Sequence, residues 1–390
     1  MNIPLLLVAL ATFATGTAEN IVIGILPDVA SGLGVSTGLA GQLTSVFSVT
    51  FALAAPAALL LTARLGRKTL LLLALGLFVA SNLLAAASLN YGVLVAARIG
   101  MAAASATACL VATMLATEIV PPGKRGRAIG LIFMGISASL VLGVPAGMLV
   151  SSAFGWRSVF IGLALFAASV LFACRWFVPV AGRSKPPRGG RYASHLRSLS
   201  CVCAQLVSVL MIGGHFILFA YLAPYLAEIV GMRGDEVVTA FFAFGVAGVC
   251  GGYLGGRFSD AVAPRLAIRL TPLAYLLALI AIPFVADTRL PFLAVMMLWG
   301  CISWMISPVV QSFLIRQSPQ TAEAGIGLNL SAMHVGVGLG TGIGGVLVEA
   351  ASPSALPAAA AILAGLAVVA AFAATWRAPA SNKVSRQAAS

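Results

Sequence analysis

A single acidic side chain, Glu19, lies deep inside an apolar stretch of this sequence, while the other acids fall at the ends of such stretches or between them. Ionisable groups inside a membrane-length apolar segment are costly, so they are candidates for function. A carboxyl group that only supported structure there would be a cost, whereas one that binds and releases a proton can couple a carrier to a proton gradient. We therefore predict that Glu19 carries a coupling proton and that the protein needs no other cofactor.

A basic partner for Glu19 can be placed from helix geometry. A helix that enters from one side near Pro4 carries Glu19 about 22 Å along its axis, and one that enters from the opposite side near Val93 carries Arg98 about 8 Å inward. In a hydrocarbon core of about 30 Å, the two residues reach the same level. We expect Arg98 to pair with Glu19 and tune it, because pairing relieves two isolated charges. The alternative is that Arg98 only braces neighbouring helices.

Two histidines, His215 and His334, also lie within apolar stretches. An imidazole titrates near neutral pH, so each could relay protons or hydrogen-bond a polar substrate. Each could equally be a hydrogen-bonded packing residue. We place His215 in substrate binding and leave open whether His334 or His215 takes part in coupling.

Polar and aromatic side chains in the second half of the sequence could line a substrate cavity. The predicted substrate-binding set is His215, Tyr221, Gln311, Asn329 and Trp304. The indole of Trp304 offers a surface on which a planar molecule can stack, and the other side chains offer hydrogen-bond donors and acceptors. Trp304 could alternatively anchor the chain at a lipid interface.

Membrane-spanning helices must hold these residues. Hydrophobic residues make up 61% of the 390 residues and charged residues 8%, and the mean hydropathy is +1.06, which no soluble core requires. Apolar runs of about twenty residues, enough for a helix to cross the hydrocarbon core, recur along the chain. They predict an all-α polytopic membrane protein with twelve helices, at 4–26, 39–61, 69–88, 93–117, 126–150, 157–178, 202–226, 237–257, 266–286, 291–314, 324–347 and 356–376.

The distribution of basic residues predicts the orientation in the membrane. Alternate connections are rich in Lys and Arg, and the connections between them are poor in both. The rich set comprises Arg64, Arg67, Lys68, Lys124, Arg125, Arg127, Arg175, Arg183, Lys185, Arg188, Arg191, Arg197, Arg257, Arg265, Arg269 and Arg316, and the poor set comprises Arg157, Arg233 and Arg289. Because basic loops stay inside the cell, we expect a multi-pass protein of the cell membrane with both termini in the cytoplasm.

The chain is predicted to consist of two halves of six helices. The longest polar break contains paired prolines, paired glycines and several basic residues, which is typical of a linker. The expected organisation is an N-terminal half at 1–178, a cytoplasmic linker at 179–200, a C-terminal half at 201–376 and a cytoplasmic tail at 377–390. One set of residues recurs in the second helix of each half, which favours duplicated halves with pseudo-two-fold symmetry and a site between them. These residues are Phe51, Ala54, Leu61 and Arg64, matched by Phe244, Ala247, Leu254 and Arg257.

Other function classes fit the sequence less well. A membrane enzyme would need a catalytic cluster such as paired acids or histidine-rich metal ligands, which one buried acid and two distant histidines do not supply. The formal charge of +13 is dispersed among loops, which argues against a nucleic-acid partner. Two six-helix halves with a titratable acid favour alternating access over an open channel. We expect a monomer whose partners are lipid, protons and a small-molecule substrate.

Glycine and proline patterns predict packing and movement. Within 126–150, Pro145 removes a backbone hydrogen bond and the flanking Gly143 and Gly147 permit close contact, so this run is a candidate hinge. Two glycine stripes with a spacing of four residues predict close helix contacts elsewhere. They are Gly248, Gly252 and Gly256, and Gly336, Gly340 and Gly344.

Three of these features together resemble the major facilitator superfamily, specifically its twelve-helix drug:proton antiporter branch. They are the basic loop Arg64-Leu-Gly66-Arg67-Lys68, Arg98, and the run Gly143-Val-Pro145-Ala-Gly147. The resemblance covers nearly the whole chain and implies the superfamily fold, export, and gating by the loop residues. The chain departs from the superfamily at Leu59 and Ala63, where that loop usually has Gly and Asp.

Further motifs look like those of bacterial purine efflux pumps of the PbuE type, and sugar and chloramphenicol exporters share several of them. They are Glu19 with Gly24-Ile-Leu-Pro27, Ala40-Gly-Gln-Leu43, Leu61-Thr-Ala63, Arg127-Ala-Ile-Gly130, Gly155-Trp-Arg157, Gly214-His215, Ala220-Tyr221, Ala223-Pro224, Trp299-Gly300 and Ser303-Trp304. The leading hypothesis is a proton-coupled exporter of purine bases, nucleosides or similar small polar molecules. The alternative is a multidrug, chloramphenicol or sugar exporter of the same branch.

Overall fold

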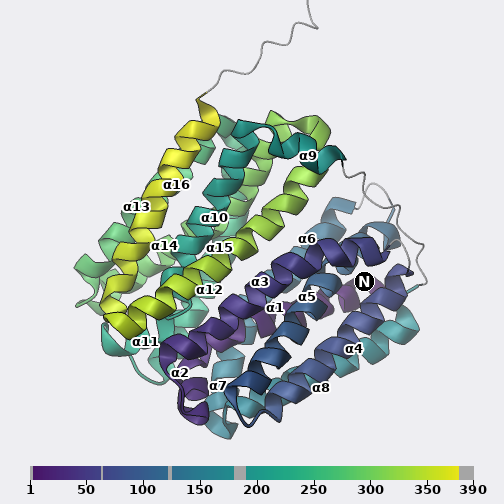
Figure 1. The fold of residues 1–390 in the computed structure, drawn as a ribbon, viewed down its shortest axis with the longest axis horizontal. Helices are drawn as coiled ribbons and strands as arrows, with labels where there is room; N and C mark the ends of the chain where they lie inside the picture. Colours follow the sequence, from purple (N-terminus) through teal and green to yellow (C-terminus); the bar gives the residue numbers. More distant parts are fainter. Residues whose placement is uncertain (1–2, 63–64, 122–124, 180–189, 377–390) are drawn as a thin grey trace, which may run out of the picture.

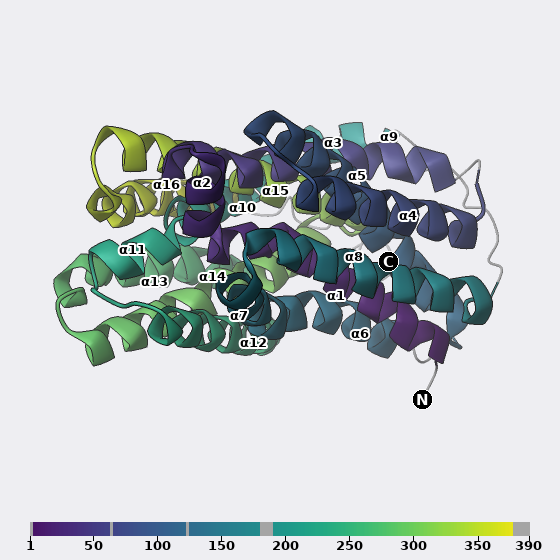
Figure 2. The same ribbon diagram turned by 90° about the horizontal axis from the view of Figure 1, so that it is seen from below.

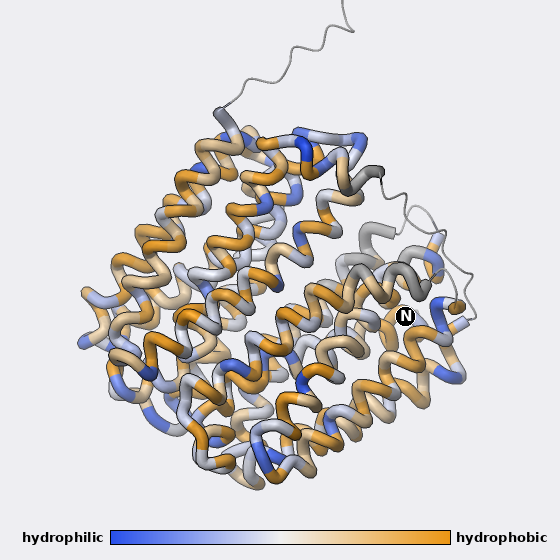
Figure 3. The backbone as a smooth tube through the Cα atoms, viewed as in Figure 1, coloured by the Kyte–Doolittle hydropathy of each residue, from blue (hydrophilic) through white to orange (hydrophobic). Residues whose placement is uncertain are grey.

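A computed structural model describes residues 3–62, 65–121, 125–179 and 190–376 of the chain. Within these ranges, twelve helices are long and apolar enough to cross a membrane. The predicted all-α fold class with twelve spans is thereby confirmed. Figure 3 shows hydrophobic residues along the helices and hydrophilic residues mainly near their ends. That pattern suits helices in lipid, where the backbone satisfies its own hydrogen bonds and the side chains face hydrocarbon.

The described helices form two groups that follow each other in the sequence (Figure 1). The first group comprises α1 (Ile3–Gly24), α2 (Leu26–Leu33), α3 (Thr37–Thr62), α4 (Arg67–Ala86), α5 (Tyr91–Ile119), α6 (Arg125–Ala138), the π-helix η2 (Ser139–Gly143), α7 (Val144–Phe154) and α8 (Trp156–Phe177). The second comprises α9 (Gly190–Leu196), α10 (Leu199–Phe219), α11 (Leu222–Glu228), α12 (Asp235–Ala261), α13 (Pro264–Val285), α14 (Arg289–Gln317), η3 (Pro319–Thr321), α15 (Ala322–Ala350), η4 (Pro353–Ala355) and α16 (Leu356–Thr375).

The first and seventh expected helices, at 4–26 and 202–226, are each divided by a break that lies before the predicted end of the helix. The first breaks at Ile25, and the seventh breaks between Phe219 and Leu222. Each break lies just before a proline, Pro27 or Pro224, because proline has no N–H to donate and its ring clashes with the carbonyl four residues earlier. The short helices α2 and α11 therefore turn away from the long helices that precede them.

The two groups meet along two pairs of elements. Helix α3 packs against α15, and the run α6–η2–α7 packs against α12 (Figures 1 and 2). Helices α2 and α11 lie together at one end of the bundle, and the N-terminus and α9 lie at the opposite end. We call these the α2–α11 end and the terminal end.

Glycines allow the close helix contacts, but one predicted stripe is displaced. A Cβ on Gly340 would lie 2.1 Å from the carbonyl oxygen of Gly213 on α10, which confirms close packing of the α15 stripe. On α12 the glycines that face α14 are Gly248, Gly251 and Gly255. Gly252 and Gly256 have open space beside them, so the predicted α12 stripe is wrong beyond Gly248. An α-helix has 3.6 residues per turn, so steps of three and four alternate along one face.

The expected linker is partly helical. Residues 180–189 lie outside the described residues, as does the predicted tail at 377–390. The helix α9 falls inside the linker range and packs against α10 and α15, and α10 begins at Leu199. The second group of helices therefore begins within the stretch assigned to a polar connection.

Candidate functional site

Arg98 is fully buried on α5 and holds α1 by its backbone. Its guanidinium donates to the carbonyl oxygens of Ala18 and, at 3.2 Å, Glu19. It also donates at 3.4 Å to Leu43 of α3 and lies 4.3 Å from the centre of the Phe47 ring. The expected pairing of Arg98 with the carboxylate of Glu19 is replaced in this structure by contacts to carbonyls, so Arg98 fixes where α1 lies between α3 and α5.

The carboxylate of Glu19 faces the other group of helices. Its Oε1 atom lies 3.5 Å from Nε2 of His334 on α15, and the side chain is 21% exposed. Nδ1 of His334 lies 2.9 Å from the carbonyl oxygen of Leu330, and Phe51 of α3 stacks on the imidazole with ring centres 3.8 Å apart. His334, whose part was left open, therefore stands at the meeting of α1, α3 and α15.

A row of contacts continues from His334 to the α2–α11 end and joins the two groups. Ser45 donates to the carbonyl oxygen of Gly338 at 3.1 Å, and the amide of Gln42 donates to Gly342 at 3.5 Å. At the far end the hydroxyl of Ser36 donates to Glu349. The described hydrogen bonds thus fasten α3 to α15 from the middle of the helices to the α2–α11 end.

Tyr221 belongs to this row rather than to a ligand pocket. It is fully buried at the break between α10 and α11. Its hydroxyl lies 3.1 Å from the carbonyl oxygen of Thr341 and 3.3 Å from that of Gly38, so its single hydrogen can be donated to either. The residue predicted to bind substrate instead links α11 to α3 and α15.

His215 is packed in an aromatic cluster of the second group. Its Nδ1 lies 3.0 Å from the hydroxyl of Ser303, which itself donates to the carbonyl of Trp299, so the imidazole is the donor to Ser303. The rings of Phe219, Trp299 and Phe244 have centres 5.0, 5.1 and 5.8 Å from its own. This is the surrounding of a hydrogen-bonded packing histidine, which was the alternative stated for it.

The remaining members of the predicted substrate set lie apart from one another. Asn329 donates to Gln205 at 2.9 Å and to Ser208 at 2.8 Å within the second group. Gln311 of α14 donates to Ser307 at 3.0 Å and lines a hollow between α12 and α14. Trp304 is half-buried against Gly248 of α12. The structure therefore does not gather the five predicted substrate residues into one site.

The predicted hinge lies where α1 packs closely against the fifth span. The π-helix η2 ends at Gly143, and α7 begins at Val144 with Pro145 in its first turn. A Cβ on Gly143 would lie 2.3 Å from Oγ1 of Thr17, and one on Gly147 would lie 2.2 Å from Cδ1 of Ile21. Both glycines thus face α1 near Glu19, and a π-turn of this kind often marks a place where a helix bends.

The predicted gating loop is described in part. Arg64 lies outside the described residues. Gly66 precedes the first turn of α4, and Lys68 lies within that turn. Arg67 forms an ion pair with Glu118 of α5, which ties α4 to its neighbour at the terminal end.

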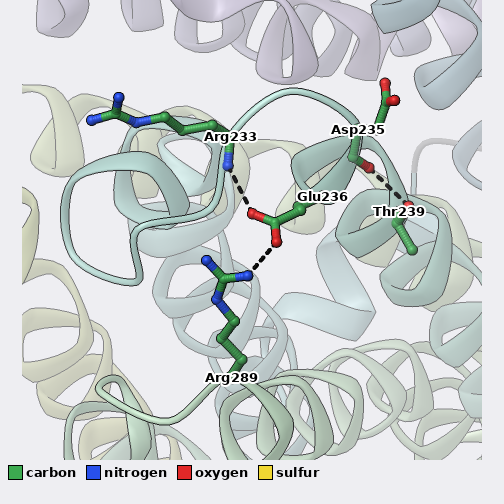
Figure 4. A network of polar contacts seen from close by, with 5 residues as sticks. All are labelled: Arg233, Asp235, Glu236, Thr239 and Arg289. Carbon is green, nitrogen blue, oxygen red and sulfur yellow. Dashed lines mark hydrogen bonds and ion pairs between the residues drawn. The ribbon is translucent and has the colours of Figure 1, made fainter.

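A polar cluster at the α2–α11 end joins two connections of the second group (Figure 4). Glu236 accepts a hydrogen bond at 3.3 Å from the backbone N–H of Arg233 and forms an ion pair with Arg289. Beside it, Thr239 donates to the backbone carbonyl of Asp235 at 2.8 Å. Glu236 thus holds the connection before α12 against the start of α14.

Sequence reasoning missed the row on α3 because its members are ordinary residues. Ser36, Gln42 and Ser45 are small or neutral and carry no chemical signature. A signal exists in their spacing, since polar residues on one face of an otherwise apolar helix indicate contact with another helix. Their partners on α15 are mostly backbone carbonyls of glycines, Gly338 and Gly342, which no side-chain pattern could reveal.

Comparison with known proteins gives the family. The sequence profile of the Major Facilitator Superfamily matches residues 8–325. The chain is 32% identical over 343 residues to the uncharacterized MFS-type transporter YbcL of Bacillus subtilis, with 88% of both chains covered. It is 30% identical over 364 residues to the chloramphenicol efflux pump Rv0191 of Mycobacterium tuberculosis, with 91% of this chain and 88% of that one covered.

Solved structures share the fold. A bacterial homologue of the human lysosomal transporter Spinster, in an inward-facing and occupied conformation, superposes with a TM-score of 0.77 at 18% identity, covering 95% of this chain and 96% of that one. The twelve helices and the paired groups define a multi-pass membrane transporter. The chain belongs to the Major Facilitator Superfamily and is a transporter rather than an enzyme, as the resemblance implied.

Proposed function

We propose that this transporter is a proton-coupled antiporter that exports small molecules by alternating access. The observation that carries the proposal is the carboxyl group of Glu19, which lies within the first span at the contact between the two groups of helices. A titratable acid at such a contact can meet water on one side and then on the other as the groups rock against each other. In each cycle a proton bound by Glu19 moves inward and a substrate moves outward.

Export is supported by the relatives. The chloramphenicol efflux pump that matches most of the chain is named for outward transport. In an exporter, Glu19 loads its proton when the site faces outside, and it releases that proton when the site faces the cytoplasm and substrate binds. Arg98 takes part by holding α1 in place through the carbonyls of Ala18 and Glu19.

Two substrate classes are proposed. Purine bases and nucleosides follow from the resemblance to purine efflux pumps, and the half-buried Trp304 and Gln311 offer a stacking surface and an amide. Chloramphenicol is the second candidate, favoured by the 30% identity to the pump named for it. Both are small, planar in part and hydrogen-bonding, so the choice between them depends on the lining of the cavity.

The coupling role is tested with purified protein in liposomes under an imposed pH gradient. Glu19→Gln keeps the shape of the side chain but cannot cycle a proton, so it should abolish uphill transport while leaving substrate binding in place. The matched control is Glu228→Gln, which changes an exposed acid at the end of α11. If Glu19→Gln drives substrate uphill as well as the parent does, coupling resides elsewhere.

The substrate is tested in the same liposomes with labelled hypoxanthine, adenosine and chloramphenicol in separate assays. The purine proposal expects accumulation of hypoxanthine or adenosine that depends on the pH gradient. Transport of chloramphenicol without transport of either purine would assign the second candidate.

A further inference from the structure

The imidazole of His334 is held so that one of its nitrogen atoms faces Glu19. Nδ1 lies 2.9 Å from the carbonyl oxygen of Leu330, and a carbonyl can only accept, so Nδ1 carries a hydrogen. In the neutral ring, Nε2 therefore presents a lone pair to Oε1 of Glu19, 3.5 Å away. Among the described residues Nε2 is buried and has no hydrogen-bond partner. The contact between the two side chains is thus incomplete unless a proton lies between them.

The number of protons on this pair decides whether it attracts or repels. With Glu19 ionised and His334 neutral, two acceptors face each other and the contact is unfavourable. One added proton makes either a carboxylic acid that donates to Nε2 or an imidazolium that donates to a carboxylate, and both are attractive. Phe51 stacks on the ring with planes 1° apart, so it holds the imidazole in this direction and can also stabilise its cationic form.

We propose that one proton shared between Oε1 of Glu19 and Nε2 of His334 acts as a latch that keeps the two groups of helices closed toward the α2–α11 end. The inference rests on the proposed proton-coupled cycle and adds a cause to it: the proton that is transported also sets the conformational equilibrium. Glu19 belongs to α1 and His334 to α15, so the shared proton joins helices that must separate when the α2–α11 end opens.

The latch stands at the inner end of the row of contacts between α3 and α15. The rest of that row consists of hydrogen bonds to backbone carbonyls and the bond from Ser36 to Glu349. Glu349 is exposed at the far end of α15, where its carboxylate meets solvent. The Glu19–His334 pair at the inner end of the row is less exposed, with side chains 21% and 10% exposed, and it is the contact there whose strength a proton can change.

Other charged and titratable groups bear on the pair from α5. Arg98 lies within electrostatic range of Glu19 and binds its backbone carbonyl, and Cys109 is a half-buried thiol also within range of the carboxylate. When the proton leaves, the negative charge of Glu19 is compensated by Arg98 rather than by His334. Arg98 on α5 thus stabilises the ionised form of Glu19, and this favours loss of the Glu19–His334 contact to α15.

The order of events suits export when the termini lie in the cytoplasm, as the basic loops predict. A loaded latch keeps the outer end closed while substrate enters from inside. Release of the proton to the cytoplasm weakens the latch and lets the outer end open with substrate bound. Loading from outside then closes the outer end again after the substrate has left.

The test measures the α2–α11 end directly by the distance between two spin labels. The labels are placed at Ser31→Cys on α2 and Ser354→Cys on η4, which are exposed on opposite groups, in a variant without the six native cysteines. The protein is reconstituted without substrate and without a gradient, and the pH is raised from about 5 to about 9, across the range in which imidazoles and buried carboxyls titrate. Because one proton is released, the closed-to-open ratio should fall by up to about tenfold per pH unit in the titrating range.

Four variants decide whether the pair is responsible. Glu19→Gln can donate permanently from its amide to Nε2, so the closed distance should persist at every pH. His334→Gln and His334→Leu cannot exchange a proton, so each should lose the pH response, and thermal unfolding of each confirms that it is folded. His215→Gln removes another buried imidazole of the same group and should keep the response of the parent.

Three outcomes overturn the latch. They are a parent distance that does not change with pH, a response of Glu19→Gln that follows the parent, or His334 variants that follow the parent. The proposed antiport fails separately, by uphill transport in Glu19→Gln, so the two ideas can be rejected independently.

Discussion

Arg98 shows how a buried cation can act through the backbone of its neighbours. Its guanidinium reaches carbonyls on α1 and α3 and lies over Phe47, which a planar, multiply donating group can do at once. An extra donor to the carbonyls of Ala18 and Glu19 fixes the rotation of α1, and the rotation of α1 directs the Glu19 side chain toward α15. We therefore regard Arg98 as a positioning residue for the proposed proton site.

The depth of Glu19 and Arg98 along their helices could be predicted by counting residues, but the direction of their side chains could not. The rise per residue of an α-helix is fixed, so depth along a helix can be predicted. Rotation about the helix axis depends on packing, and α1 is apolar on nearly all sides, so its sequence does not define a single buried face. The rotation of the helices in the second group was likewise not predictable. His215 and Asn329 therefore contact other side chains of that group, which the sequence did not indicate.

His195 offers a test of stability at the level of one residue. It is fully buried on α9, and its ring nitrogens lie 3.1 Å from the hydroxyl of Thr321 and 3.3 Å from the amide nitrogen of Gln205. The amide nitrogen of Gln205 has two hydrogens and can only donate: one goes to the carbonyl of Gly325 at 2.8 Å and the other to Nε2 of His195. The neutral imidazole therefore carries its hydrogen on Nδ1 and donates to Thr321. Burial lowers the pKa of His195 from its ordinary value of 6.5.

Because the folded state resists protonation of His195, the unfolded state binds more protons once the pH falls below 6.5. The free energy of unfolding should therefore decrease with falling pH in that range, by at most about 1.4 kcal/mol per pH unit for one group. Thermal unfolding of the parent and of His195→Gln in detergent, measured at several pH values, checks this. A parent curve that is parallel to that of the variant below pH 6.5 would show that His195 is not the group responsible.

At the scale of elements, the fifth span combines a close contact with an irregular turn. The π-helix η2 places an extra residue in the helix just before Pro145, and both features leave backbone groups with weaker hydrogen bonding. Proline and glycine types were visible in the sequence, and they predicted the position of this irregularity. The π-turn itself was not predictable, because it depends on how α6 and α7 fit against α1 and α12.

The contact with α1 predicts a graded effect of enlarging Gly143. A methyl group there would lie 2.3 Å from Oγ1 of Thr17, so α1 and the fifth span must move apart or Thr17 must rotate away from its bond to Phe13. We expect Gly143→Ala to lower the unfolding temperature and slow transport, and Gly143→Leu to slow transport further. The cost of inserting a methyl group into a packed contact is about 1–3 kcal/mol.

The control for this prediction is Gly162→Ala on α8, where no atom lies within 4 Å of the added methyl group. Alanine has the higher helix propensity, so this change should be neutral or slightly stabilising, by up to about 1 kcal/mol. Transport rates and unfolding temperatures of both alanine variants are compared in the same lipid. Full transport and unchanged stability in Gly143→Leu would remove both the close contact and the hinge as functional features.

At the scale of the whole molecule, the two groups of helices are joined by contacts with different properties. The α3–α15 contact contains hydrogen bonds and the Glu19–His334 pair beside it, while the α12 contact relies on small residues. For example, a Cβ on Gly245 would lie 2.9 Å from the carbonyl oxygen of Leu140 in η2. Under the proposed mechanism the first contact responds to protons, and the second serves as the close surface about which the groups rotate.

The orientation of the molecule in the membrane is the last prediction. Two of the few basic side chains at the α2–α11 end have partners there. Arg289 pairs with Glu236 (Figure 4), and Arg157 donates at 2.9 Å to the carbonyl of Ser88 and lies 4.2 Å from the centre of the Trp156 ring. The basic connections gather at the other end, so that end should stay in the cytoplasm.

Reporter fusions after Trp376 and at Ser354, which lies between α15 and α16, should then report opposite compartments, cytoplasmic for the first and periplasmic for the second. A fusion at Arg233, before α12, serves as the control and should agree with Ser354. The same compartment for the fusions at Trp376 and Ser354 would mean that the last helix does not cross the membrane. Opposite compartments in the exchanged order, periplasmic for Trp376 and cytoplasmic for Ser354, would reverse the direction in which the proposed latch loads and releases its proton.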